Sequence, residues 1–345
     1  MKLRDSRITL AHGNGGRLMR ELIDEIFAPA LANPDLDTGA DAVGLPDCSG
    51  QMVVTTDGFT VQPLEFPGGD IGSLAVHGIV NDLAVSGALP RFMTLSVFLE
   101  EGLEIALLRR VIESLAAAAR QSDIAVVAGD TKVLGRGDCD GIYLAATGVG
   151  FRPPNTQLSL GGIRPGDRIL VSGPVGNHGA AVLLARQEFG LRGELLSDAA
   201  SVLPQAQALL AVPGLRFMRD PTRGGLATVA CEIARATRLA VRLEEARIPV
   251  EDAVQSVCEL LGFDPLYLAC EGRLVAVVAA EAAQAALASL RGVAPQAALI
   301  GEVLASRGAD EPAGGAAGVR VTLATAFGGE RCMDELEDDP LPRIC

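Results

Sequence analysis

The sequence predicts a two-domain protein with an α+β N-terminal domain, an α/β C-terminal domain and a flexible C-terminal tail. Of the 345 residues, 49% are hydrophobic, which is enough to fill the cores of two domains. Strand-like and helix-like patterns alternate in two blocks, and residues 152–167, rich in Pro and Gly, connect them. After residue 327 the periodicity stops.

The first block consists of an N-terminal arm at 1–40 and a domain at 41–151. The arm contains a glycine turn at 12–16 and an amphipathic stretch at 18–31. In the domain, alternating and β-branched runs predict strands, and longer periodic stretches predict helices. The predicted strands are 52–56, 91–99, 124–128 and 142–150, and the predicted helices are 71–86 and 104–121.

The second block is an α/β domain predicted at 152–326, followed by a tail at 327–345. Its strands are expected at 168–172, 215–218, 239–243, 274–279, 298–303 and 319–323, and its helices at 178–189, 225–237, 250–261 and 282–290. Composition predicts a loop at 307–318. When extended, the tail can span roughly 60 Å, which exceeds the radius of either domain.

The composition disfavours several classes of function. With 43 acidic and 29 basic residues, the net charge of −14 repels a phosphate backbone, so nucleic acid is a poor partner. The chain starts without the apolar run of a signal peptide and contains no stretch of about 18 apolar residues, so we expect a soluble cytoplasmic protein. The seven cysteines form no CxxC pair, and an odd number does not suit a disulfide framework.

Four aspartates are candidate ligands. Asp57, Asp130 and Asp220 each follow an apolar strand-like run, and carboxylates at strand ends face crevices where α/β folds bind ligands and metal ions. Asp82 lies in an apolar helical stretch, where a buried carboxylate is costly without a cation or hydrogen bonds. Turn formation or helix capping explains an isolated aspartate equally well. Four together favour Mg²⁺ sites that hold the phosphates of a nucleotide.

Two glycine turns could present backbone amides to an anion. The first contains Gly13, Asn14 and Gly15, and the second, at Gly68 and Gly69, leads directly into a predicted helix. Flexible loops are the alternative interpretation of both turns. Neither fits a P-loop or a GxGxxG motif, so a nucleotide would be held in another way.

Lys132 and Glu271 are the candidates for proton transfer. Each follows an apolar run, where desolvation would favour the neutral form of the side chain. A surface lysine and a turn glutamate are the alternatives. The three histidines, His12, His77 and His178, lack the spacing of metal ligands.

The terminal segment PLPRIC places a thiol at the tip of a stiff probe. Its two prolines favour an extended backbone, Leu341 and Ile344 can enter apolar pockets, and Arg343 partly offsets the terminal carboxylate. Cys345 is therefore predicted to be a nucleophile that enters and leaves a nucleotide site, activated by that site or by Arg343. A disordered tail that ends in Cys by chance is the alternative.

Five internal motifs and the terminus carry a resemblance to a known family. They are AHGNGG, TTDGFTVQPLEFPGGDIGSLAVHGIVNDLAVSGA, AGDTKV, MRDPTRGGLATV, GFDPLYLACEG and PRIC. Over nearly its whole length the chain resembles the HypE hydrogenase maturation factors. That family belongs to a superfamily with aminoimidazole ribonucleotide synthetase, thiamine monophosphate kinase and selenophosphate synthetase. The aspartate motifs indicate the superfamily, and PRIC indicates the HypE family.

The resemblance implies a ferredoxin-like N-terminal domain that pairs with a second copy into a dimeric β-barrel, and a C-terminal α/β domain with a mixed sheet. It implies an ATP-dependent carbamoyl dehydratase of [NiFe] hydrogenase maturation. The carbamoyltransferase HypF would place a carboxamide on Cys345, and ATP would phosphorylate its oxygen. Loss of the nitrogen protons would leave an S-cyanide, which passes to iron on the HypC–HypD complex.

The resemblance also implies the site residues. Cys345 would carry the substrate, and Lys132 and Glu271 would take the amide protons. The residues expected at Mg²⁺ are Asp57, Asp82, Asp130 and Asp220. The residues expected at ATP are these four with Gly13, Asn14, Gly15, Gly68, Gly69, Asn81, Thr131 and Arg223. The family implies no role for Cys332 or for the acidic stretch at 330–339.

Two other functions stay open on the sequence. One is a small-molecule kinase or a selenophosphate synthetase, although the latter has its reactive residue near the N-terminus and the first cysteine here is Cys48. The other is a non-catalytic carrier of the Cys345 thiol. A carrier would have no use for the aspartate, lysine and glutamate set.

Overall fold

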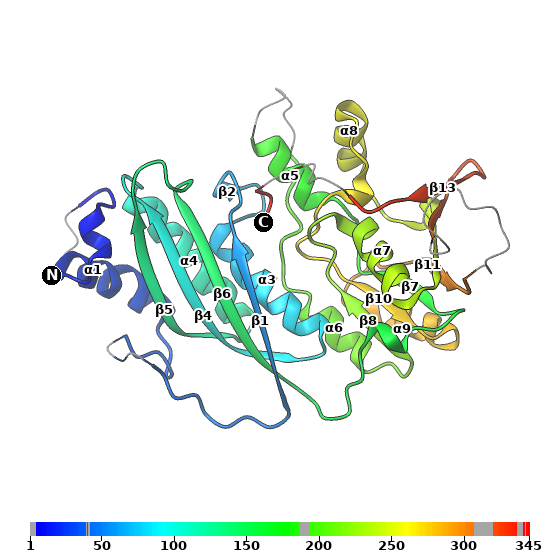
Figure 1. Cartoon of the computed structure of the whole chain (residues 1–345), viewed down its shortest axis with the longest axis horizontal. Helices are drawn as coiled ribbons and strands as arrows, with labels where there is room; N and C mark the ends of the chain where they lie inside the picture. The colour runs from blue at the N-terminus through cyan, green and yellow to red at the C-terminus, as the bar shows by residue number, and fades with distance from the viewer. Residues whose placement is uncertain are drawn as a thin grey trace. The chain divides into compact units, whose positions relative to one another are not determined.

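The chain folds into two units (Figure 1). The computed structural model describes residues 5–38, 40, 42–186, 194–306, 320–336, 341 and 343–345. The first unit lies within 1–83 and 88–154 and includes the last three residues, and the second lies within 84–87 and 155–342. The tip at residues 343–345 is therefore part of the first unit, whereas the described tail residues 327–336 and 341 belong to the second.

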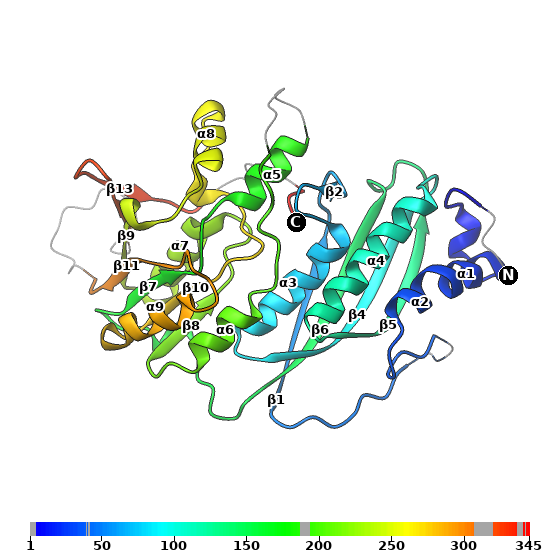
Figure 2. The same cartoon turned by 180° about the vertical axis from the view of Figure 1, so that it is seen from behind.

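The first unit is built on a four-stranded sheet in the order β1-β6-β4-β5. β6 pairs antiparallel with β1 and β4, whereas β4 and β5 are parallel. Helices α3 and α4 cover one face, and no helix of this unit covers the other in either view (Figures 1 and 2). The bounds are β1 (Gln51–Phe59), β4 (Leu89–Glu100), β5 (Ala125–Leu134), β6 (Ile142–Arg152), α3 (Ile71–Val85) and α4 (Ile105–Gln121).

Side-chain periodicity explains this layer. In α4, Leu108, Ile112 and Leu115 recur at helical spacing and are fully buried. In β4, Leu95, Val97 and Leu99 alternate with less buried residues and are buried as well. The core of the first unit therefore lies between the helices and one face of the sheet.

Short elements complete the first unit. The N-terminal arm forms η1 (Leu10–Gly13), α1 (Arg17–Leu22), η2 (Ile23–Phe27) and α2 (Ala28–Leu31), and a small hairpin pairs β2 (Glu65–Phe66) with β3 (Gly69–Asp70). The amphipathic stretch expected at 18–31 is thus helical throughout.

The second unit is built on a seven-stranded sheet in the order β13-β12-β9-β11-β7-β10-β8. Only β12 and β9 are parallel among these pairs, so the predicted mixed sheet is confirmed. The strands are β7 (Arg168–Val171), β8 (Leu215–Arg219), β9 (Ala240–Glu244), β10 (Val275–Val278), β11 (Ala298–Leu304), β12 (Val321–Ala324) and β13 (Glu330–Met333). Its α-helices are α5 (Asn177–Ala185), α6 (Leu203–Leu210), α7 (Gly225–Thr237), α8 (Asp252–Leu261) and α9 (Ala283–Arg291).

Both faces of this sheet are covered. Ile169 and Val277 pack against α7 residues on one face, and Leu170 and Ala276 pack against residues of α6 and α9 on the other. The 3₁₀ turns of this unit are η3 (Leu160–Gly162), η4 (Glu245–Arg247), η5 (Pro265–Tyr267) and η6 (Ala280–Ala282). Within the parts of the chain that the structure describes, no helix is both long and apolar enough to cross a membrane.

Three expectations need correction. The first unit is not ferredoxin-like, because its elements run β1, α3, β4, α4, β5, β6, whereas a ferredoxin-like domain runs βαββαβ. The tail is not without regular structure from residue 327 onward, because β13 pairs with β12. The helix α6 was not predicted. The loop expected at 307–318 lies outside the described residues.

Candidate active site

Asp57 and Asp82 lie on the same side of the first unit. The Thr55 hydroxyl donates to Asp82 Oδ2 at 2.6 Å, which joins β1 to α3. Asp57 is two residues beyond Thr55 on β1 and so shares its face of the strand. Asn81, next to Asp82, is buried. Asp57 was predicted to follow the strand, but it lies inside β1, and Asp82 lies in a helix as predicted.

Asp130, Thr131 and Lys132 lie inside β5, which continues to Leu134 and not only to residue 128 as predicted. Lys132 Nζ is 3.0 Å from Asp130 Oδ2, and about half of each side chain is exposed. Thr131, which lies between these two residues in the sequence, faces the other side of the strand and is buried. The lysine is therefore a surface residue paired with a carboxylate.

The sheet register separates these two groups. Residues directly opposite one another in a sheet share a face, and Asp57 lies in one such row with Ala146, Leu95 and Gly129. Asp130 is the residue after Gly129, so its side chain is on the opposite face from Asp57. β1 and β5 are the two edge strands, three strand spacings or about 14 Å apart. Within one chain, Asp57 therefore faces the helices and Asp82 points from α3 toward β1, whereas Asp130 and Lys132 face the bare side.

The first glycine turn lies against β5. A side chain at Gly13 would come within 2.8 Å of the backbone nitrogen of Val133, so only glycine allows this approach. Asn14 Oδ1 accepts the Gly16 amide at 3.0 Å, and Gly15 has a positive φ of 77°. The turn thus lies next to the Asp130 and Lys132 strand, as a nucleotide site on β5 would require.

A pocket of about 170 Å³ opens beside the same strand. Apolar side chains of the N-terminal arm, among them Met19, Ile23 and Phe27, form one wall, and Asp130 and Thr131 lie at its margin. Its lining combines a mostly apolar wall with a few polar groups, which is typical of a small-molecule site.

The second glycine turn is already occupied by a side chain. Gly68 has a positive φ of 97°, and Gly69 begins β3. Asp70 Oδ1 accepts the amides of Gly72 and Ser73 at 2.7 and 3.1 Å, so a carboxylate of the chain itself caps α3. The anion site expected at this helix end therefore already holds an anion.

The C-terminal tip is bound to the segment that follows β1. The Thr60 amide donates to the Cys345 carbonyl oxygen and the Gln62 amide donates to that of Arg343, both at 3.2 Å. Ile344 is buried, and the C-terminus lies beside β2 in both views (Figures 1 and 2). The end of the chain thus lies next to the strand that carries Asp57.

In the second unit, Asp220 and Glu271 lie at the same end of the sheet. Asp220 follows β8, and the Glu271 segment precedes β10, which is antiparallel to β8. The Cys270 amide donates to the Pro221 carbonyl oxygen at 3.0 Å, which joins the two segments. Both carboxylates are buried, whereas Arg223 is exposed in the turn before α7.

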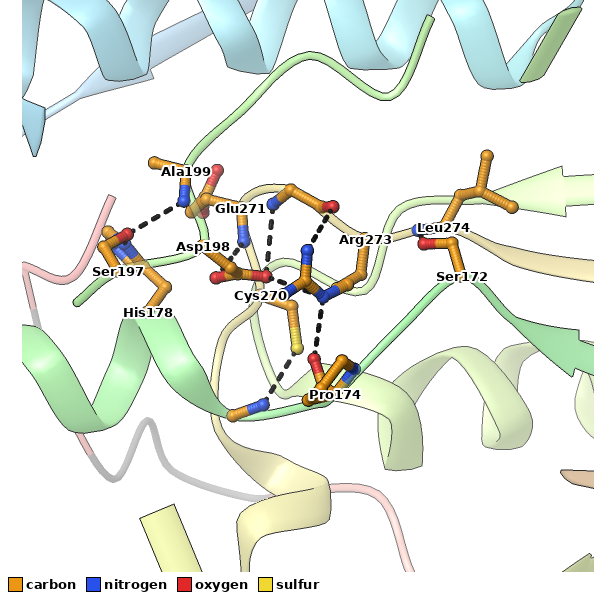
Figure 3. A network of polar contacts seen from close by, with 12 residues as sticks. Ser172, Pro174, His178, Ser197, Asp198, Ala199, Cys270, Glu271, Arg273 and Leu274 are labelled. Carbon is orange, nitrogen blue, oxygen red and sulfur yellow. Dashed lines mark hydrogen bonds and ion pairs between the residues drawn. The ribbon is translucent and has the colours of Figure 1, made fainter. Parts of the chain in front are cut away.

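A buried carboxylate holds the Glu271 segment (Figure 3). Asp198 accepts the amides of Glu271 and Gly272 at 3.2 and 3.3 Å and lies 3.6 Å from Arg273 Nε. Arg273 also donates to the carbonyl oxygens of Pro174 and Gly272 at 2.8 and 3.0 Å. Sequence reasoning missed Asp198, because no local pattern distinguishes it from an aspartate in an ordinary turn.

His178, one of the three histidines without metal-ligand spacing, is fully buried on α5. Its Nδ1 is 2.8 Å from Ser197 Oγ, which accepts the Ala199 amide at 3.0 Å (Figure 3). Either atom of the His178–Ser197 pair can be the donor, according to the tautomer of the imidazole. The histidine therefore anchors the chain just before Asp198.

The cysteines differ sharply in their surroundings. Cys139, Cys231, Cys258 and Cys270 are buried, and burial raises the pKa of Cys231 and of Cys258 to about 11. Cys332 is exposed, and Cys48 and Cys345 are partly exposed. The buried thiols are poor nucleophiles at neutral pH, which leaves three accessible candidates.

The described residues contain no group of three or more His, Cys, Asp or Glu side chains arranged to hold a metal ion. The described part of the chain therefore offers no complete protein cage for a metal ion. Mg²⁺ normally takes one or two carboxylates together with phosphate oxygens and water, so the pair Asp57 and Asp82 fits that ion in the presence of a nucleotide.

Comparison with known proteins identifies relatives over the whole chain. Residues 39–151 match the N-terminal domain, and residues 164–311 the C-terminal domain, of AIR synthase related proteins. Carbamoyl dehydratase HypE of Rhodobacter capsulatus is 45% identical over 348 residues, covering all of both chains.

Two solved structures extend the comparison. A hydrogenase maturation protein HypE in complex with ATP has a TM-score of 0.90 at 43% identity, covering 97% of this chain and 99% of that one. A chain of a HypE–HypF complex has a TM-score of 0.77 at 38% identity, covering 91% and 99%.

Proposed function

The chain belongs to the carbamoyl dehydratase HypE family, and from this premise we propose that it converts an S-carboxamide on Cys345 into an S-cyanide for hydrogenase maturation. In the balanced reaction, –S–C(O)NH₂ and ATP give –S–C≡N, ADP and phosphate. The carboxamide oxygen leaves with the phosphoryl group, and the nitrogen loses both protons. The supporting observation is the tip of the chain, bound beside β1 through Thr60 and Gln62.

The thiol of Cys345 is the proposed carrier. It is partly exposed at a chain end whose backbone the first unit holds by hydrogen bonds. The high pKa of the buried thiols Cys231 and Cys258 removes them as competitors. Cys332 is accessible too, but it lies within strand β13 and not at the end of the chain.

ATP is proposed to be the second substrate. The pocket beside Asp130 and Thr131 offers apolar walls to a base, and the glycine turn at Gly13 lies next to the same strand. Asp57 and Asp82 are the proposed Mg²⁺ ligands at the other edge of the sheet, with Asp130 and Asp220 assigned to the ion by family resemblance. A bound Mg²⁺ would neutralise phosphate charge.

Proton removal is assigned to Glu271 and Lys132. An amide nitrogen is barely acidic until its oxygen is phosphorylated, so a positioned base is needed after that step. Glu271 is buried, and its backbone is held by Asp198, which suits a base that must keep one position. Lys132 must first leave its ion pair with Asp130.

Assembly with a second copy is part of the proposal. Neither edge strand, β1 or β5, pairs with a further strand in the part of the first unit that the structure describes. Met52 and Val54 on β1 are about 60% exposed on the face that no helix covers. A homodimer that closes the two sheets into a barrel would bury these side chains. It would also bring Asp57 on β1 of one chain toward Asp130 and Lys132 on β5 of the other.

Two further partners follow from the chemistry. The thiol must receive its carboxamide from a carbamoyltransferase, and HypF is the proposed donor. The S-cyanide must then reach iron, for which the HypC–HypD complex is the proposed acceptor. Both transfers require the tip of the chain to leave its place beside β1.

Mass analysis of the C-terminal peptide tests this function. Incubation with carbamoyl phosphate, ATP, Mg²⁺ and HypF should add one carboxamide to Cys345, and one water should then be lost only when ATP is present. Cys345→Ala should abolish both changes, because the acceptor sulfur is gone. Cys332→Ser, the matched accessible cysteine, should retain both. An unmodified wild-type peptide would favour a small-molecule kinase instead.

A further inference from the structure

We propose that Asp140 is a positioning residue for the tip of the chain, and that Arg343, Tyr143 and Gln62 complete a latch around it. The latch would set how long Cys345 remains bound beside β1. The consequence for the two half-reactions rests on the proposed function, whereas the latch itself rests on contacts within the first unit.

The contacts converge on one aspartate. The Arg343 guanidinium donates to Asp140 Oδ2, and the Tyr143 hydroxyl donates to the same oxygen at 2.8 Å. The Gln62 side chain donates to the Asp140 carbonyl oxygen at 2.6 Å, while the Gln62 amide donates to the Arg343 carbonyl oxygen at 3.2 Å. Gln62 therefore holds both partners of the ion pair.

A second carboxylate fixes the loop that carries Asp140. Glu100 at the end of β4 accepts the amides of Gly137 and Gly141 at 2.8 and 2.9 Å. The loop thus presents Asp140 from a defined position just before β6. The hydrogen bond between the Tyr143 hydroxyl and Asp140 raises the pKa of Tyr143, so the phenol stays protonated and remains a donor.

The bound tip has a backbone shape that needs external support. Arg343 has a φ of 58°, a left-handed value that residues other than glycine seldom adopt. The neighbouring Ile344 is buried, and the two backbone hydrogen bonds from Thr60 and Gln62 flank the arginine. Loss of the Asp140 contact should therefore favour release of the tip.

The latch is suited to reversible binding. Arg343 and Asp140 remain partly exposed, with 56% and 35% of their side chains accessible, and exposed ion pairs are weak and sensitive to salt. Under the proposed function, the partner enzyme modifies the thiol while the tip is out, and dehydration takes place while the tip is in. A weaker latch should thus affect the two steps in opposite directions.

Asp140→Asn tests the latch, because it keeps the size of the side chain and removes the charge. We expect the Cys345 thiol, followed by mass analysis of the C-terminal peptide, to be alkylated by iodoacetamide about three to ten times faster than in the wild type. Arg343→Gln should have the same effect, and the double variant should add nothing further. Asp138→Asn, an exposed aspartate of the same loop, should leave the rate unchanged.

The half-reactions give a second readout. In Asp140→Asn, single-turnover dehydration of the carbamoylated chain should slow by a similar factor, while carbamoylation should be as fast or faster. Equal alkylation rates in Asp140→Asn and wild type, or the same change in Asp138→Asn, would overturn the latch. A wild-type chain that is never carbamoylated would instead refute the proposed function, and the alkylation comparison would still decide the latch.

Discussion

At the scale of single residues, burial decides which groups can take part in chemistry. Four of the seven cysteines are buried, and burial raises the pKa of Cys231 and Cys258, whereas the terminal thiol is accessible. Lys132, a candidate base, has an exposed side chain paired with Asp130, while Glu271 is buried. The two candidates for proton transfer thus lie in very different surroundings.

His77 makes a testable contribution to the pH dependence of stability. Burial lowers its pKa from 6.5 to about 4, and its Nδ1 has no hydrogen-bond partner among the described residues. Between these pH values the unfolded chain binds a proton that the folded chain does not. The free energy of unfolding should therefore fall as the pH drops from 6.5 to 4, by up to about 3 kcal/mol.

Urea denaturation at several pH values measures this effect. His77→Gln removes the titrating group, so its free energy of unfolding should depend less steeply on pH across this range than that of the wild type. Parallel curves for the two proteins would show that His77 is not the group responsible.

At the scale of elements, strand length and close backbone contacts shape the site. The extension of β5 to Leu134 places Asp130 and Lys132 on one face of a strand and Thr131 on the other. In the second unit, the segment before β10 is held by Asp198 through two consecutive amides. This closely packed segment has no space for a larger side chain at Gly272, so substitution of Gly272 should destabilise it.

Gly272→Ala should destabilise the second unit by about 1–3 kcal/mol. A Cβ at this position would lie 1.8 Å from the Asp198 carbonyl oxygen, so the segment that carries Glu271 would have to move. Urea denaturation measures the loss, and dehydratase activity should fall with it because Glu271, the proposed base, is displaced.

Gly161→Ala is the matched control in the same unit. Its Cβ would meet only Ser159 Oγ, at an ordinary 3.8 Å, and its φ is not positive. Its effect should stay within about 0.5 kcal/mol. Equal losses in the two variants would contradict the role assigned to close packing at Gly272.

At the scale of the whole molecule, the bare face and the two open edges of the first sheet point to a second copy. Val54→Glu places a charge on the face where Val54 is 58% exposed. We expect the wild type to sediment as a dimer in analytical ultracentrifugation and Val54→Glu to shift toward the monomer, because the charge would be buried unpaired in the barrel.

Leu260→Glu controls for a general effect of removing an exposed apolar side chain. Leu260 is 71% exposed on α8 of the second unit, and its substitution should leave the dimer intact. A monomeric wild type, or equal dissociation of both variants, would exclude the proposed assembly.

The sequence by itself determined most of the elements and much of the candidate chemistry. Hydrophobic patterns located α3, α4 and the four strands of the first sheet, because α4 and the strands bury one face and α3 is buried almost throughout. The helical position of Asp82 and the unusual terminal Cys345 were also visible locally. The family resemblance extended this to a substrate and a reaction.

Only the tertiary structure decided which residues meet. The register of the first sheet places Asp57 and Asp130 on opposite edges and faces, and the hydrogen bonds of Asp198 and Asp140 reach residues far away in the sequence. The strand order also replaced the expected ferredoxin-like arrangement. Local patterns report only whether a residue is buried or exposed, whereas contacts between distant segments depend on how the strands pair and how the loops pack.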